Sequence, residues 1–197
     1  TNIEVTSNGV TLYQSDFVNQ GTNGWNAFNG SWSTVNGLYQ QTAQIIDCYS
    51  TYLNNDSTNW ANYTINLQAR KTGGAEGFLI MFNVLDNNNW TWWNIGGWGD
   101  TQDGIEQMVA GNKTTYAQVP QTIAANTWYY IRIVVTGSRA QCYLGTSPGS
   151  LTLVQDVTLP SAQDGLFVSS TYAQAAGQII VKAVNPYGTA LPTTFNL

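Results

Sequence analysis

The hydrophobic pattern of this chain excludes long helices and favours many short strands. Short runs rich in Val, Ile, Tyr, Phe and Trp recur along the sequence, and clusters of Gly, Asn, Asp and Pro separate them. No long segment shows the 3.6-residue period of an amphipathic helix. Many strands at regular spacing, with no helix between them, predict an all-β fold, an antiparallel β-sandwich.

Two hairpins can be placed from their turns. Residues 77–84 are nearly all apolar, which is typical of a central strand covered on both faces. The polar tract 85–89 is a turn, so residues 77–84 are expected to pair with 90–95. Residues 128–135 and 140–144 are expected to form a second hairpin.

Further strands are expected at 38–42, after the turn Val35-Asn36-Gly37, and at 63–70, where apolar and polar residues alternate. The last part of the chain changes character, with apolar strands at 166–171 and 179–184. We therefore expect a lectin-like sandwich over residues 1–164. Residues 165–197 either close that sandwich or begin a second domain, and the pattern leaves both alternatives open.

The composition excludes several classes of function. Only 9% of residues are charged, the net charge is −5 and the pI is near 4.3. Nucleic acid and anionic membranes are therefore not expected as partners. Histidine is absent, which removes the usual general base and the usual zinc ligand. Low charge together with abundant Asn, Gln, Ser, Thr, Tyr and Trp is typical of secreted, polysaccharide-active proteins, so an extracellular location is expected.

Residues 90–107 carry four of the eight tryptophans, together with glycines, acids and glutamines. An indole offers a large apolar face and an N–H that needs a partner. Such a mixture suits a sugar, whose C–H faces stack on rings while its hydroxyls bind amides and carboxylates. Packing in the sandwich core is the alternative for any single ring.

Strand alternation divides residues 90–95 between two faces. Trp93 and Ile95 are expected to face the core, whereas Trp92 and Asn94 are expected on the outer, concave face. Trp98, in a glycine-rich loop, is expected at the rim.

Three further side chains are expected at this site. Gln102 and Glu106 are placed with Trp98 at the rim, and Arg70, with Gln68, is placed on the same face by a neighbouring strand. For Arg70 and Glu106, an ion pair beneath the site is an equal alternative to sugar contact. The remaining tryptophans are assigned to core and edge packing, and Tyr49 and Tyr52 mainly to surface packing. These tryptophans are Trp25, Trp32, Trp60 and Trp128.

Several sequence segments resemble the concanavalin A-like (laminin G-like) module of family 51 α-L-arabinofuranosidases. The resemblance implies a concanavalin A-like jelly roll attached to plant polysaccharide chemistry, and the tail at 177–186 resembles the C-terminal sandwich segment of those enzymes. The matching segments together span about residues 24 to 160. They are Gly30-Ser31-Trp32, Asn36-Gly37-Leu38-Tyr39, residues 69–78, residues 92–99 with Thr101-Gln102 and Glu106-Gln107, residues 128–133, and Cys142-Tyr143-Leu144.

The acids do not favour catalysis. Glycoside hydrolysis usually needs two convergent carboxylates. Asp100, Asp103 and Glu106 lie three apart, so neighbours face opposite sides of an extended strand. The Glu-x-Asp-x-x-Glu motif of concanavalin A-like glycosidases is absent. In the resembling family, the catalytic acids lie on a separate (β/α)8 barrel, so this chain is not expected to be an enzyme by itself.

Metal binding and disulfide formation each have an alternative. A structural calcium ion would need oxygen ligands, which Asp16, Asp100, Asp103 and Asp164 offer, whereas turn capping explains each Asp without a metal. Cys48 and Cys142 form either one disulfide or two separate buried thiols.

The sequence therefore predicts a non-catalytic carbohydrate-binding module for plant cell-wall polysaccharide of the arabinoxylan, arabinan or xylan type. The main alternative is a structural domain that supports the catalytic barrel of a parent α-L-arabinofuranosidase and has no ligand of its own. In that case the tryptophans pack against the barrel. An intact small glycosidase is the third alternative.

Overall fold

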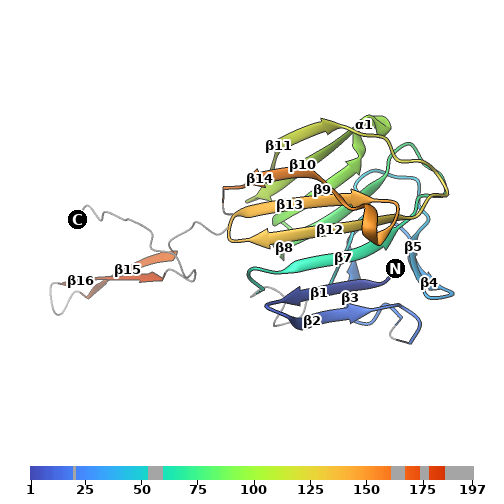
Figure 1. The fold of residues 1–197 in the computed structure, drawn as a ribbon. Helices are drawn as coiled ribbons and strands as arrows, with labels where there is room; N and C mark the ends of the chain where they lie inside the picture. The colour runs from blue at the N-terminus through green and yellow to red at the C-terminus, as the bar shows by residue number, and fades with distance from the viewer. Residues whose placement is uncertain (20, 53–59, 161–166, 174–177, 185–197) are drawn as a thin grey trace. The chain divides into compact units, whose positions relative to one another are not determined.

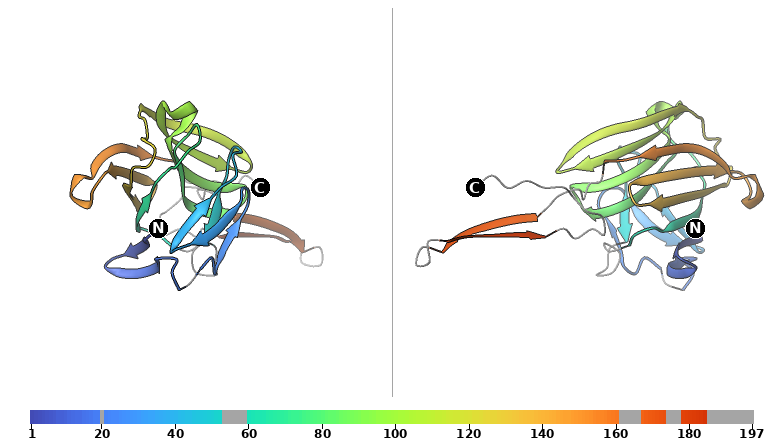
Figure 2. Two further views of the ribbon diagram at one scale, coloured as in Figure 1. Left: turned by 90° about the vertical axis from the view of Figure 1, so that its right-hand side faces the viewer. Right: turned by 60° about the vertical axis from the view of Figure 1, so that its left-hand side comes forward.

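The computed structural model describes residues 1–19, 21–52, 60–160, 167–173 and 178–184. The chain divides into two compact units, Thr1–Leu159 and Pro160–Leu197. The first unit is built from antiparallel sheets, as Figures 1 and 2 show, so the predicted antiparallel β-sandwich is confirmed.

The larger sheet of the first unit has six strands in the order β14-β13-β12-β7-β1-β2. Consecutive strands form hairpins at both ends of this order, and β7 joins the two halves by pairing with β1 and β12. The strands are β1 (Ile3–Ser7), β2 (Val10–Ser15), β7 (Thr64–Ala69), β12 (Tyr129–Thr136), β13 (Arg139–Gly145) and β14 (Thr152–Thr158).

The facing sheet has four strands in the order β11-β10-β9-β8. A short turn segment, α1 (Gly97–Asp100), connects β9 to β10. The strands are β8 (Phe78–Asp86), β9 (Asn89–Gly96), β10 (Gln102–Val109) and β11 (Asn112–Pro120).

Two small ribbons and one 3-10 turn complete the first unit. The strands β3 (Trp25–Ala27) and β6 (Ser50–Tyr52) pair with each other, as do β4 (Trp32–Val35) and β5 (Leu38–Gln41). The predicted turn between β4 and β5 is present, with Asn36 and Gly37 both at positive φ. The 3-10 turn is η2 (Pro148–Ser150).

The main core lies between the two sheets. Ile65 of β7 and Ile133 of β12 belong to the same buried cluster as Trp93 and Ile95 of β9 and Ile105 of β10. The predicted inward face of the 63–70 strand is confirmed, because Tyr63 and Ile65 are buried and Leu67 and Ala69 pack against them. Burial of apolar side chains from both sheets is the main stabilising contribution to this unit.

Both predicted hairpins form, as β8–β9 and β12–β13. The prediction of a central strand at 77–84 is wrong, however, because β8 is the last strand in the described four-stranded sheet. Its apolar character arises from two clusters. Phe82 lies in the main core, whereas Leu79 and Met81 pack on the opposite face of the sheet, against Trp90 and Trp92.

The second unit contains β15 (Phe167–Ala173) and β16 (Gln178–Val184), which pair antiparallel. The two apolar strands expected in the tail are therefore present. Whether the tail closes a sandwich or begins another domain stays a prediction.

The two cysteines are not paired. Cys142 is buried in the main core, and Cys48 lies beside Gln41 in the loop before β6. Of the two alternatives, the structure has two separate thiols.

Candidate functional site

The polar groups predicted to bind a ligand gather on the outer face of β9 and β10. Alternation places Trp93 in the core and Trp92 and Asn94 on the opposite face, as predicted. In the register of the two strands, Glu106 pairs with Trp92, and Gly104 pairs with Asn94. We call Trp92, Asn94, Trp98, Glu106 and Lys113 the outer-face site.

Glu106 is the centre of this site. Its Oε2 accepts the indole N–H of Trp92 at 2.7 Å and a longer hydrogen bond from Nδ2 of Asn94 at 3.5 Å. The ammonium of Lys113, on the neighbouring strand β11, lies 3.5 Å from Oε1. A carboxylate held by an indole and an amide is oriented by its partners, whereas a lysine pair of this length is weak and easily displaced.

Trp92 is not an open stacking platform, contrary to the prediction. The side chain is only 1% exposed. The ring of Trp90 lies 4.2 Å away, the ring of Tyr49 packs on its edge at 6.2 Å, and Lys113 Nζ lies 4.8 Å from the ring centroid. Alternation identified the correct face but gave no information on which side chains cover it. The role of Trp92 here is to position Glu106.

Trp98 is the exposed ring of the site, with 38% of its surface accessible. Its backbone is left-handed, with φ 50° and ψ 48°, and Gly96 and Gly99 on either side also have positive φ. Gly104 leaves room for the Trp98 ring, since a Cβ on Gly104 would lie 2.4 Å from Cη2 of Trp98. The absence of that Cβ lets the indole lie directly over β10, beside Asn94.

The turn that carries Trp98 is anchored at several points. The Gly99 N–H donates to Glu76 at 3.0 Å. Asp100 accepts the Ile123 N–H at 2.7 Å and pairs with Lys71 at 2.7 Å. These hydrogen bonds, with the desolvation that opposes them, lower the pKa of Asp100 below its usual value. A strained turn held by side chains from other segments presents its ring in a defined position.

Of the remaining predicted residues, Gln102 belongs with the site and Arg70 does not. Gln102 has the same parity as Gly104 and Glu106 on β10, so its side chain projects from the same face. Arg70 follows β7, which lies in the other sheet, and its guanidinium stacks over the ring of Trp128 at 4.9 Å. The placement of Arg70 at the site is therefore wrong, as is its alternative of an ion pair with Glu106, whose ionic partner is Lys113.

Two aromatic residues near the site were not assigned to it from sequence. Tyr49, expected mainly in surface packing, is buried against Trp90 and Trp92. Phe28 stacks on Tyr49 with ring centroids 4.6 Å apart, and it is 58% exposed. Both residues lie in irregular segments, so no strand period signals their contact with β9. The expected packing role of Trp25, Trp32, Trp60 and Trp128 agrees with their partial burial and ring contacts.

The acids do not converge as a catalytic pair. Asp103 faces the core and is fully buried, whereas Glu106 projects from the outer face of the same strand. One oxygen of Asp103 accepts the Gly96 N–H at 2.7 Å, and the other has no partner among the described residues. Burial raises the pKa of Asp103 to about 6, and the negative charge of Asp100 acts in the same direction.

The residues expected as calcium ligands have other partners. Asp16 caps a turn by accepting the Val18 N–H, Asp100 and Asp103 are bonded as described above, and Asp164 lies outside the described residues. Within the described ranges, no three acidic or cysteine side chains form a group suited to a metal ion. The described part of the chain also has no helix long and apolar enough to span a membrane.

The fold and the outer-face site define a β-sandwich with a carboxylate, amide and indole group on one face. Over 143 residues, 72% of the chain, it is 35% identical to an extracellular exo-α-L-arabinofuranosidase of Streptomyces chartreusis, which confirms the predicted resemblance to such an enzyme. The match spans only 17% of that enzyme's length. Among solved structures, the chain is similar to the carbohydrate-binding module CBM66 from Bacillus subtilis, with a TM-score of 0.47, 18% identity, and coverage of 68% of this chain and 79% of the module. No protein-family model matches the sequence.

Proposed function

We propose that this chain is a non-catalytic carbohydrate-binding module and that the outer-face site holds the sugar. The observation that carries the proposal is the half-exposed Trp98 ring fixed over β10 beside the Asn94–Glu106 pair. A ring that stacks on C–H groups, next to an amide and a carboxylate that bind hydroxyls, matches both parts of a sugar surface.

Ligand entry requires Lys113 to move. Glu106 and Asn94 are 6% and 9% exposed, and the Lys113 side chain is the partly exposed group paired with Glu106. Its 3.5 Å ion pair costs little to break, because exposed lysine pairs contribute about 0–1 kcal/mol. A sugar hydroxyl donating to Glu106 replaces that contact, while Trp92 continues to hold the carboxylate from below.

The relative's name narrows the substrate class. Since the similar enzyme is an extracellular arabinofuranosidase, we propose arabinoxylan, arabinan or xylan as the polymer, and secretion with a catalytic domain as the setting. The chain's own acids support a binding role, because Asp103 and Glu106 face opposite sides of β10.

Affinity electrophoresis tests this proposal. The chain is run through gels containing arabinoxylan, arabinan, xylan or β-glucan. Trp98→Ala is the site variant, and Trp128→Ala is a tryptophan control at the residue just before β12 of the other sheet. We expect retardation on at least one arabinose- or xylose-containing polymer, loss of it in Trp98→Ala and retention in Trp128→Ala. A folded chain that no polymer retards contradicts the proposal.

A supporting role for a catalytic barrel is the second candidate. It is favoured by exposed apolar side chains near the start of the chain, namely Phe28 at 58%, Ile45 at 56% and Ile46 at 83%. Exposed apolar groups of this kind mark protein contacts when they form one patch. Under this alternative, Phe28→Ser and Ile46→Ser reduce the stability of a chain joined to its parent barrel but leave the isolated chain unchanged.

A further inference from the structure

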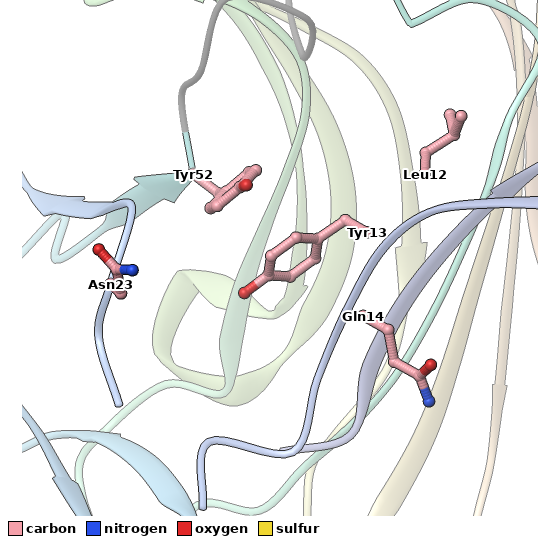
Figure 3. A pocket seen from close by; sticks show the side chains of 5 residues that line it. All are labelled: Leu12, Tyr13, Gln14, Asn23 and Tyr52. Atoms are coloured by element: carbon pink, nitrogen blue, oxygen red, sulfur yellow. The ribbon is translucent and has the colours of Figure 1, made fainter. Parts of the chain in front are cut away.

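A pocket lies beside β2, the last strand of the six-stranded sheet. It has a volume of about 330 Å³ and is lined by Leu12, Tyr13, Gln14, Asn23 and Tyr52 (Figure 3). We call these residues the tyrosine pocket. They come from β2, the turn before β3 and the end of β6, none of which belongs to the sheet that carries the outer-face site. The volume is at the lower end of the range for small-molecule sites, about 300–1,000 Å³.

Two tyrosine rings form one wall of this pocket. The rings of Tyr13 and Tyr52 lie 4.1 Å apart with an interplanar angle of 37°. Tyr52 is supported on the far side by Trp60, with centroids 6.4 Å apart. Gly24, in the turn before β3, lets the Tyr52 ring pack closely against this turn, because a Cβ on Gly24 would lie 2.6 Å from Cε2 of Tyr52. The rings are thus held by packing before any ligand arrives.

The Tyr13 hydroxyl is prepared to donate a hydrogen bond. It accepts the indole N–H of Trp25 at 2.8 Å. A phenol oxygen that accepts a hydrogen bond can still donate its own proton to another partner. The hydrogen bonds of the described residues assign that proton no acceptor, and they assign the exposed Asn23 amide no partner. Figure 3 shows the Tyr13 hydroxyl and the Asn23 amide on the same side of the pocket.

Among the residues that the structure describes, the pocket lining has no charged side chain. Leu12 and Gln14 lie on either side of Tyr13 on β2, and both also line the pocket. The groups that line the pocket are therefore two tyrosine rings with their hydroxyls, the side-chain amides of Gln14 and Asn23, and the apolar side chain of Leu12. This set favours a neutral, polyhydroxylated ligand over an anion or a cation.

We infer that the tyrosine pocket is a second sugar site, which binds one residue of a neutral oligosaccharide through Tyr13, Tyr52 and Asn23. The inference rests on the proposed carbohydrate-binding function and adds a separate contact to it. Two sites on one chain raise the affinity for a polymer above that for a short fragment, because the second contact becomes intramolecular.

A ¹⁵N–¹H titration of the full chain with arabino- and xylo-oligosaccharides separates the two sites. The indole N–H of Trp25, bonded to Tyr13, reports on the pocket, and the indole N–H of Trp98 reports on the outer-face site. The variants are Tyr13→Phe, which keeps the ring, and Asn23→Ala. Gln44→Ala is the control, because it removes an exposed amide that lines neither the tyrosine pocket nor the outer-face site.

We expect both indole signals to shift. Asn23→Ala and Tyr13→Phe should weaken the affinity reported by Trp25 by between about two-fold and about ten-fold, the effect of one hydrogen bond. Gln44→Ala should change neither signal's response. If Trp98 responds and Trp25 does not, the pocket inference is overturned and the proposed function stands. If Trp25 responds and Trp98 does not, the pocket is supported and the assignment of the outer-face site fails. If neither responds, both fail.

Discussion

Trp92 and Trp93 are neighbours in the chain and are almost equally buried, yet they belong to different surroundings. Trp93, at 0% exposure, lies between the sheets among aliphatic side chains, and its indole N–H has no partner among the described residues. Trp92, at 1% exposure, lies on the other face and donates to Glu106 at 2.7 Å. One ring contributes apolar contact to the core, and the other orients a carboxylate.

Burial alone therefore does not distinguish a tryptophan of the core from a tryptophan of the outer-face site. On the inner face, polar atoms are tolerated at a cost that the surrounding apolar packing offsets. On the outer face, indole, amide, carboxylate and ammonium are arranged around one another, and the exposed Trp98 lies next to them. Such an arrangement is typical of a binding surface, in which buried polar groups hold the exposed ligand-binding side chains in position.

The largest expected effect falls on the inner face. Trp93→Ala should lower the free energy of unfolding by about 3–5 kcal/mol, because it leaves a large cavity between the sheets. Urea denaturation followed by circular dichroism measures the change. A loss below about 1 kcal/mol would mean that the inner face is not the main core, and the contrast with Trp92 would fail.

Asp103 makes the stability of the inner face dependent on pH. Its pKa is raised from 3.8 in the unfolded chain to about 6 by burial, so folding favours the neutral carboxyl. This contribution is fully present below pH 3.8 and is lost as the pH rises through about 6. Asp103→Asn removes the titration and should exceed the wild type in stability at pH 8, by at most about 3 kcal/mol.

The measurement is the difference in unfolding free energy between wild type and Asp103→Asn at pH 4, 6 and 8. Taking the difference removes the contributions of all other titrating groups. A difference that stays constant across this range would show that Asp103 titrates alike in the folded and unfolded chains.

Substitutions of Glu106 test the hydrogen-bonded group on the outer face. Glu106→Ala leaves the Trp92 N–H buried without an acceptor and should cost about 1–3 kcal/mol of stability. Glu106→Gln keeps an acceptor at the same place and should cost less, while both variants lose sugar binding. Thermal unfolding with affinity electrophoresis separates the two effects. Equal stability losses for Ala and Gln would show that the charge, and not the Trp92 hydrogen bond, matters on this face.

Strand periods were sufficient to predict much of the fold and part of the site. Alternation separated Trp92 and Asn94 from Trp93 and Ile95 correctly, because a strand's period depends only on its own residues. Pairing between distant strands was not predictable in the same way. Arg70 was placed beside the wrong sheet because nothing local indicates that β7 pairs with β1 and β12.

The second feature that could not be predicted from the sequence is which side chains cover the outer face of β9 and β10. Tyr49 closes the face over Trp90 and Trp92 from a loop, and Lys113 reaches Glu106 from β11. Both contacts depend on how irregular segments and side chains lie in space, which no period encodes. The glycine-rich turn around Trp98 was more informative, since glycine tolerates the positive φ angles that Gly96 and Gly99 adopt there.

Trp98 is the residue that we propose binds ligand while contributing little to the stability of the fold. Isothermal titration calorimetry with an arabinoxylan or arabinan oligosaccharide, together with thermal unfolding, compares the wild type with Trp98→Ala. We expect about ten-fold weaker binding, equivalent to about 1.4 kcal/mol, with nearly unchanged thermal stability. Gly104→Ala, whose Cβ would lie 2.4 Å from the indole, should displace the ring and weaken binding as well. A large loss of stability in Trp98→Ala with affinity intact would contradict the claim and make this ring part of the core.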